Sequence, residues 1–268
     1  MSLVSSNPIL ADSVVRSAVQ QTTGSGTCTV NGVINKTTGL ILLAVVSGAV
    51  SIPVTKAYPA SLMVAFIVSL LVSIASIFLV RSSPRIAATI AVLYSVAQGY
   101  VLGALGMILQ NVLDQQGIQV PGGIALQAFL IVVGLMVAML TLFRFGILKG
   151  GAMFTAVLSV ATLGIFFTFL IAMIMGLFGV DMSWFSLQGA QSGGNAALIG
   201  LGINAVVLIV AALWMVVDFR QIQDAVAAGA PASMEWYLAF GLVVTLAWVY
   251  LEALKLVFRL AQMFGSRK

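Results

Sequence analysis

The sequence predicts an all-α membrane protein, a bundle of seven transmembrane helices. Of its 268 residues, 61% are hydrophobic and only 7% are charged, whereas soluble domains carry about 25% charged residues. The apolar residues gather in runs close to the roughly 20 residues that a helix needs to cross a bilayer. A membrane β-barrel would instead show short segments of alternating hydrophobicity.

Seven apolar runs define the predicted helices, and polar or proline-containing stretches separate them. The breaks include Pro59, the Pro84 region, Pro121, the polar stretch 179–195 and Pro231. Proline removes a backbone donor and stops or starts a helix, so these positions favour turns. The runs lie near residues 37–55, 60–80, 86–109, 122–143, 152–178, 196–217 and 236–258.

The predicted domains are a polar tail at 1–36, the seven-helix domain at 37–262 and a basic tail at 263–268. Asn7 and Pro8 favour a short interfacial helix in the first tail, although a disordered tail fits the same composition. The first apolar run begins too far into the chain for a cleavable signal peptide.

The net charge of +5 comes from scattered basic residues rather than a patch, which argues against nucleic-acid binding. Seven crossings place seven basic residues on the N-terminal side and five on the other, a weak indication of a cytoplasmic N-terminus. If the last run were re-entrant, the count would be eleven against one. The length of that run favours a full crossing.

Residue types exclude several kinds of site. Histidine is absent and Cys28 is the only cysteine, so no intrachain disulfide or cysteine-based metal site is available and pH sensing falls to carboxylates. The sequence contains no motif of a hydrolase, kinase or metalloprotease. We therefore expect neither an enzyme nor a cofactor.

Four of the seven acids fall between Val217 and Glu252. Glu252 lies inside an apolar run, about 9 Å from its Phe258 end, and Lys255 shares its helix face. It is either an interfacial Glu–Lys pair reaching for water or a carboxylate facing the bundle interior, which would mark a functional site. We expect Asp224 and Glu235 to be loop acids.

Asp218 ends the sixth apolar run and is either a solvated helix end or, if the helix continues to about residue 228, a deeper group that Gln221 could hold. Other polar candidates lie nearby in the predicted topology. The buried amides are Gln98 and Asn204, and the cations that could latch onto an acid are Arg81, Arg85, Arg144, Arg220 and Lys255. The small residues Gly99, Gly103 and Gly106 predict close helix packing.

The C-terminal third resembles the Bax inhibitor-1 family, whose bacterial members are called YccA-like proteins. The resemblance is carried by residues 218–222, DFRQI, by residues 249–259, VYLEALKLVFR, and by residues 97–103, AQGYVLG. Residues 6–8, 229–231 and 234–237 resemble a bacterial subgroup, which implies a bacterial plasma membrane. The resemblance as a whole covers nearly all of residues 1–264.

The resemblance implies a seven-helix bundle with the last helix in the centre. It also implies a calcium leak gated by two acids, one on each of the last two helices, which are Asp218 and Glu252 here. No firm metal site is predicted beyond calcium near these acids. Two features depart from the family: the second acid is Glu rather than Asp, and the connection between the acids is longer.

The longer connection bears on whether the two acids meet. Helical geometry places them about 9 Å apart in depth, too far to share a proton unless the helices tilt or extend unequally. We therefore expect either a pH-sensitive cation leak or, as the alternative, a non-transporting regulator of a membrane protease or other membrane partner. A proton-coupled transporter ranks third, because no repeat symmetry or broken helix is evident.

Overall fold

In the part of the chain that the structure describes, seven helices form along the seven predicted apolar runs. The computed structural model describes residues 26–82, 86–179 and 194–265, so the predicted interfacial helix near Asn7 lies outside the described residues. Six of the helices are long and apolar enough to cross a bilayer, and α3 carries a shorter apolar stretch, Ala60–Ser76. The helices are α2 (Val30–Ala57), α3 (Ala60–Ser82), α4 (Ala87–Gln115), α5 (Gly123–Arg144), α6 (Ala152–Leu177), α7 (Gly194–Ala227) and α8 (Met234–Phe264). The predicted fold class is confirmed.

Several helices are longer than the apolar runs that predicted them. The first begins at Val30 rather than near residue 37, because Thr29 caps it by accepting a hydrogen bond from the Gly32 amide, 3.0 Å. Capping side chains of this kind satisfy the free amides of a first turn. The sixth predicted helix, α7, continues through polar residues to Ala227. Hydrophobicity alone marks the membrane-embedded part of a helix and not its ends.

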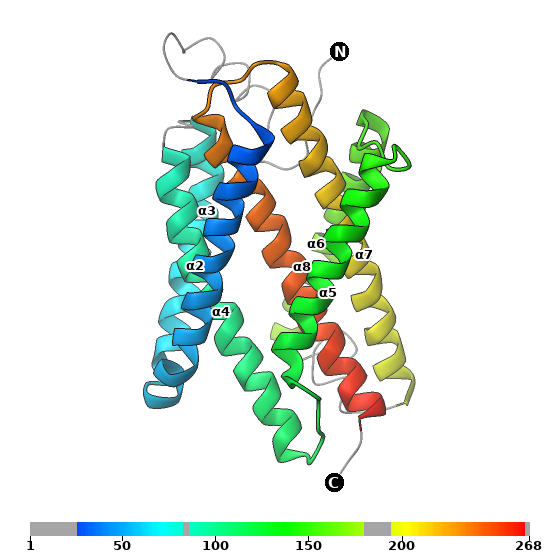
Figure 1. Ribbon diagram of the computed structural model, residues 1–268. Coiled ribbons are helices and arrows are strands. Elements are labelled where there is room, and N and C mark those ends of the chain that lie inside the picture. Colours follow the sequence, from blue (N-terminus) through cyan, green and yellow to red (C-terminus); the bar gives the residue numbers. More distant parts are fainter. Residues whose placement is uncertain (1–25, 83–85, 180–193, 266–268) are drawn as a thin grey trace.

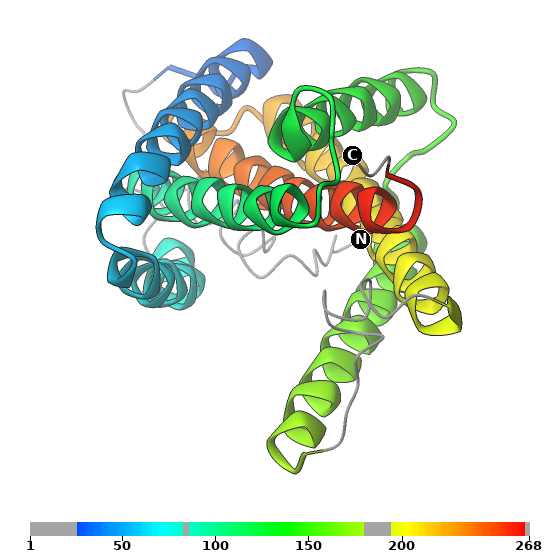
Figure 2. The same cartoon turned by 90° about the horizontal axis from the view of Figure 1, so that it is seen from below.

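The last helix, α8, lies at the centre of the bundle (Figure 1), where it packs against α2, α4, α5 and α7. Every residue from Tyr237 to Val243 is buried, so this stretch is enclosed on all sides, as expected for a helix that is apolar around its circumference. By contrast, α6 extends away from the other helices (Figure 2) and packs mainly on α7. The predicted central position of the last helix is confirmed.

The helices α2 and α4 approach closely through glycine. A Cβ at Gly99 would lie 2.3 Å from the Ala44 carbonyl oxygen, and one at Gly103 would lie 2.3 Å from the Gly48 carbonyl oxygen. Both positions therefore need glycine for the backbones to meet. Gly106 does not share this contact, because a Cβ there would meet Ala125 at an ordinary 3.7 Å. It faces α5 and α8 instead.

The chain just before α2 lies along the connection between α7 and α8. The Cys28 amide donates to the Ala230 carbonyl at 2.7 Å, and the Ala232 amide donates to the Gly26 carbonyl at 2.7 Å. These bonds form an isolated antiparallel bridge between Thr27 and Pro231. The start of α2 and the start of α8 are thereby held at the same end of the bundle.

Candidate functional site

Glu252 lies deep in the central helix. Its residue is only 3% exposed, and the helix continues beyond it to Phe264, so about 18 Å of helix separates it from that end. The prediction from the apolar run placed it about 9 Å from the Phe258 end. The sequence left open an interfacial and an interior position for this carboxylate. In the structure it lies inside the bundle.

Both carboxylate oxygens of Glu252 accept hydrogen bonds from named partners. Asn204 of α7 donates its Nδ2 to Oε2 at 2.7 Å and to the Glu252 backbone oxygen at 3.2 Å. Lys255, one turn further along α8, donates its Nζ to Oε1 at 2.5 Å. A buried charge persists only when it is paired and hydrogen-bonded. These two contacts meet that condition.

Two cations share the helix face of Glu252. Lys255 is the more accessible partner, with its side chain 21% exposed against 4% for Glu252, and its ammonium lies 5.7 Å from the centroid of the Phe169 ring of α6. Arg259, itself buried, lies near enough to interact electrostatically with Glu252. We call Glu252, Asn204, Lys255 and Phe169 the Glu252 centre.

Asp218 is also buried, at 1% exposed, but it does not belong to the Glu252 centre. Both Asn204 and Asp218 lie on α7, separated by 218 − 204 = 14 residues, which is about 21 Å along a helix. Because Asn204 touches Glu252, Asp218 lies far from Glu252 along the axis of α7. The two acids therefore do not share a proton in this conformation, and their offset exceeds the 9 Å predicted from helix ends.

Arg220, another predicted latch residue, pairs with Asp224. Arg220 binds Asp224 through its Nε, 3.0 Å to each carboxylate oxygen, and donates to the Lys149 carbonyl at 3.2 Å. Asp224 is thus part of α7, not a loop acid. Arg144 is exposed in the last turn of α5. The Arg81 side chain and all of Arg85 lie outside the described part of the chain.

The predicted amides have separate roles. Asn204 holds Glu252, as described above, whereas Gln98 accepts a hydrogen bond from Ser69 Oγ at 2.6 Å and links α3 to α4. Gln221 is partly buried on α7, three residues beyond Asp218. Hydrogen bonds across helices of this kind are common in membrane bundles. Gln98 therefore serves packing, away from the acids of α7 and α8.

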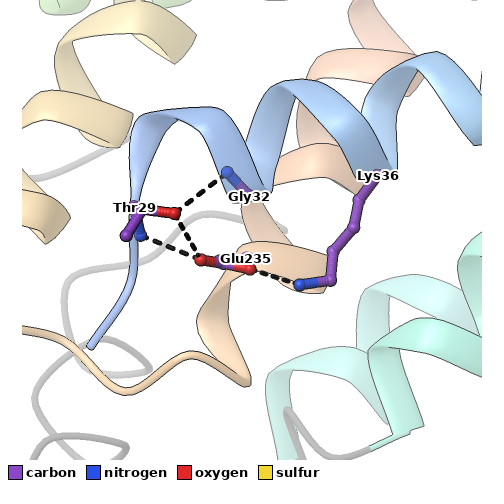
Figure 3. Close-up of polar contacts among 4 residues, drawn as sticks. All are labelled: Thr29, Gly32, Lys36 and Glu235. Carbon is purple, nitrogen blue, oxygen red and sulfur yellow. Dashed lines mark hydrogen bonds and ion pairs between the residues drawn. The ribbon is translucent and has the colours of Figure 1, made fainter. Parts of the chain in front are cut away.

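Glu235, predicted as a loop acid, is a buried residue in the first turn of α8. Its Oε1 accepts from the Thr29 amide at 2.9 Å and the Thr29 hydroxyl at 3.0 Å, and its Oε2 pairs with Lys36 (Figure 3). A Cβ at Gly32 would lie only 2.1 Å from Oε1. An acid in a first turn also suits the helix dipole, which is the one local signal that could have placed Glu235 on α8.

Cys28 lies beside this contact and is buried. Loss of hydration, reinforced by the nearby Glu235 carboxylate, raises the pKa of the Cys28 thiol to about 11, although Lys36 acts in the opposite direction. The thiol therefore stays protonated at neutral pH, and a protonated thiol is a poor nucleophile. Its environment indicates a structural cysteine.

Oxygen ligands for a cation are available at the Glu252 centre. The Glu252 carboxylate oxygens are the hard ligands that Ca²⁺ prefers, but Asn204 turns its Nδ2 donor toward them, and a full calcium shell has about six to eight oxygens. Within the described residues, no group of three or more His, Cys, Asp or Glu side chains is placed to hold a metal ion.

The sequence was also compared with known proteins. A family model described as Bax inhibitor 1 like matches residues 7–262, nearly the whole chain. The chain belongs to the Bax inhibitor 1 like family. No curated protein and no solved structure gives a significant match.

The family match agrees with the helical architecture of the chain. The match extends across all seven helices, including α7 with Asp218 and α8 with Glu252. Apolar helices of this length identify the Bax inhibitor 1 like protein as a multi-pass integral membrane protein. The family resemblance suggested from short motifs is confirmed over residues 7–262.

Proposed function

We propose that this Bax inhibitor 1 like protein is a pH-sensitive leak pathway for cations, with calcium as the proposed ion. The observation that carries the proposal is Glu252, a buried carboxylate deep within the central helix and held by Asn204 and Lys255. Ionisable groups inside membrane spans are costly and mark ion or proton pathways. In this proposal Glu252 is the acid that a passing cation meets.

Protonation supplies the pH sensitivity. A proton on Glu252 would remove the negative charge that attracts Lys255, and it would replace one acceptor oxygen with a donor. Because α8 packs against α2, α4, α5 and α7, we expect a change at Glu252 to alter the packing of the bundle. Asp218 acts as a second, separate acid in this proposal, since about 21 Å of α7 separates it from Asn204.

Calcium flux into vesicles tests the proposal. Purified protein in phosphatidylcholine–phosphatidylglycerol vesicles should pass calcium at a rate that rises or falls with pH, and Glu252→Gln should abolish that dependence and most of the flux. Asp218→Asn should reduce the flux as well. Asp224→Asn is the matched control, because Asp224 forms a partly exposed pair with Arg220. Unchanged flux in both Glu252→Gln and Asp218→Asn would exclude the proposal.

The alternative, a regulator of a membrane protease or other membrane partner, also has structural support. The tail enters the bundle at Gly26, where the chain is bonded to the start of α8 through Ala230, Ala232 and Glu235. A partner that bound the tail could act on the central helix there. Deleting residues 1–25, which leaves the Thr29 cap intact, would abolish partner binding under this alternative but leave calcium flux largely unchanged under the leak proposal.

A further inference from the structure

Lys255 places its ammonium on Oε1 of the Glu252 carboxylate, where a bound cation would lie. Its ammonium donates to Oε1, while Asn204 donates to Oε2. A Lys ammonium is a compact charge of +1 on a flexible stem, with three donors and no acceptor. It therefore satisfies a carboxylate much as a bound monovalent cation would. The ammonium and a metal ion cannot both take the same place on Oε1.

The position of Lys255 suggests that it can leave and return. Its side chain is more exposed than that of Glu252, and the stem of a lysine can carry the charge toward water. Phe169 places its ring 5.7 Å from the ammonium and favours the paired position through its π face. That ring comes from α6, the helix that extends away from the bundle and packs mainly on α7.

We propose that Lys255 is a tethered cation that fills the cation site at Glu252 Oε1, while Asn204 holds Oε2, so that an external cation passes only when Lys255 is displaced. This inference rests on the proposed leak function and assigns its closed state to one residue. Phe169 is a positioning residue that stabilises the occupied state. Without the ammonium, the Glu252 carboxylate would keep the Asn204 hydrogen bond and its interaction with Arg259 but would lose its direct ion pair, which favours recruitment of another cation at Oε1.

Calcium and potassium flux in the same vesicles, at one fixed pH, test this inference. Lys255→Met keeps the apolar stem and removes the charge, and it should raise flux on the order of tenfold, in line with the strength of a charged hydrogen bond. Glu252→Gln combined with Lys255→Met should abolish the gain. Phe169→Leu should give a smaller increase of about twofold to fivefold. Lys56→Met, at an exposed lysine near the end of α2, should change nothing.

A chemical test keeps the inference falsifiable if Lys255→Met does not fold. Lys255→Cys in a Cys28→Ser background should conduct freely. Aminoethyl methanethiosulfonate, which restores an ammonium at residue 255, should close the pathway again, whereas neutral methyl methanethiosulfonate should leave it open. Equal effects of the two reagents would overturn the inference.

The outcomes separate the inference from the proposed function. If Glu252→Gln abolishes flux but Lys255→Met leaves it at the wild-type rate, Lys255 is not the occupant and the leak proposal survives. A loss of flux in a folded Lys255→Met protein also overturns the inference, because the ammonium would then be required for passage. A flux that is unchanged by Glu252→Gln overturns both the leak proposal and the inference about Lys255.

Discussion

Individual buried charges in this protein are held by a few specific contacts. Glu235 binds Thr29 and Lys36, and Glu252 binds Asn204 and Lys255. Each contact joins α8 to another helix or its cap, except for the local pair of Glu252 with Lys255. Removing one partner of a buried pair leaves a charge without compensation, which costs more than the pair contributes.

Gly32 provides a test of the contact at Glu235. We expect Gly32→Ala to destabilise the protein by about 1–3 kcal/mol, the usual cost of overpacking, because its Cβ would overlap the Glu235 carboxylate. The thermal melting temperature in detergent measures this. Gly39→Ala is the control on the same helix, since a Cβ there has open space, and it should be neutral or stabilising. Equal melting temperatures for the two variants would contradict the structure.

Cys28 provides a pH test. With its pKa raised from 9.0 to about 11, the thiol should react with iodoacetamide roughly 100-fold more slowly than a free thiol at mildly alkaline pH, before any shielding by burial. The sign for stability follows from linkage. The unfolded thiol ionises first, so stability should fall as pH rises from about 9 toward 11, and a Cys28→Ser variant should lack this component.

At the scale of elements, helix pairs differ in how closely they approach. The pair α2 and α4 meets through Gly99 and Gly103 with almost no side chain between the backbones. Helices in lipid associate through close packing and hydrogen bonds, because lipid supplies no hydrophobic drive between them. The fit of this pair therefore depends strongly on the glycines.

Two alanine substitutions on α4 measure that dependence. Gly103→Ala should push α2 away, because its Cβ would sit 2.3 Å from the Gly48 carbonyl oxygen, whereas Gly106→Ala has room at 3.7 Å. We expect Gly103→Ala to cost about 1–3 kcal/mol and Gly106→Ala to be tolerated. Melting temperature and the yield of folded protein report the difference. A tolerated Gly103→Ala would mean that the two helices do not touch.

At the scale of the whole molecule, the seven helices of the described residues place the start of α2 and the end of α8 at opposite ends of the bundle (Figure 1). The continuous helix α8 crosses from one end to the other, in agreement with a full crossing of the last predicted run. The basic residues alone left this point open. The side of the membrane on which each helix end lies is therefore a direct test of the fold.

Cysteine labelling from outside the cell or vesicle checks this topology. In a Cys28→Ser background, Lys56→Cys and Lys149→Cys lie at the ends of α2 and after α5, and both positions are exposed. They should react with a membrane-impermeant maleimide from opposite sides. With the expected cytoplasmic N-terminus, Lys56→Cys would be the externally labelled one. Labelling of both from one side would contradict the three crossings by α3, α4 and α5 that separate these positions.

The sequence by itself predicted the seven apolar helices found in the described part of the chain, and it singled out Glu252 as an acid inside an apolar run. Helices in lipid satisfy their own backbone groups, so their existence depends on local composition and length. The absence of histidine likewise limited pH sensing to carboxylates. These properties belong to segments of the chain and need no knowledge of neighbours.

Only the tertiary structure decided which groups meet. The contact of Glu235 with Thr29 joins residues 206 apart, and that of Glu252 with Asn204 joins residues 48 apart. The tilt and register of packed helices set such contacts. A change of register by one residue moves a side chain about 1.5 Å along the helix axis. For that reason the sequence placed Asp218 too near Glu252 and assigned Glu235 to a loop.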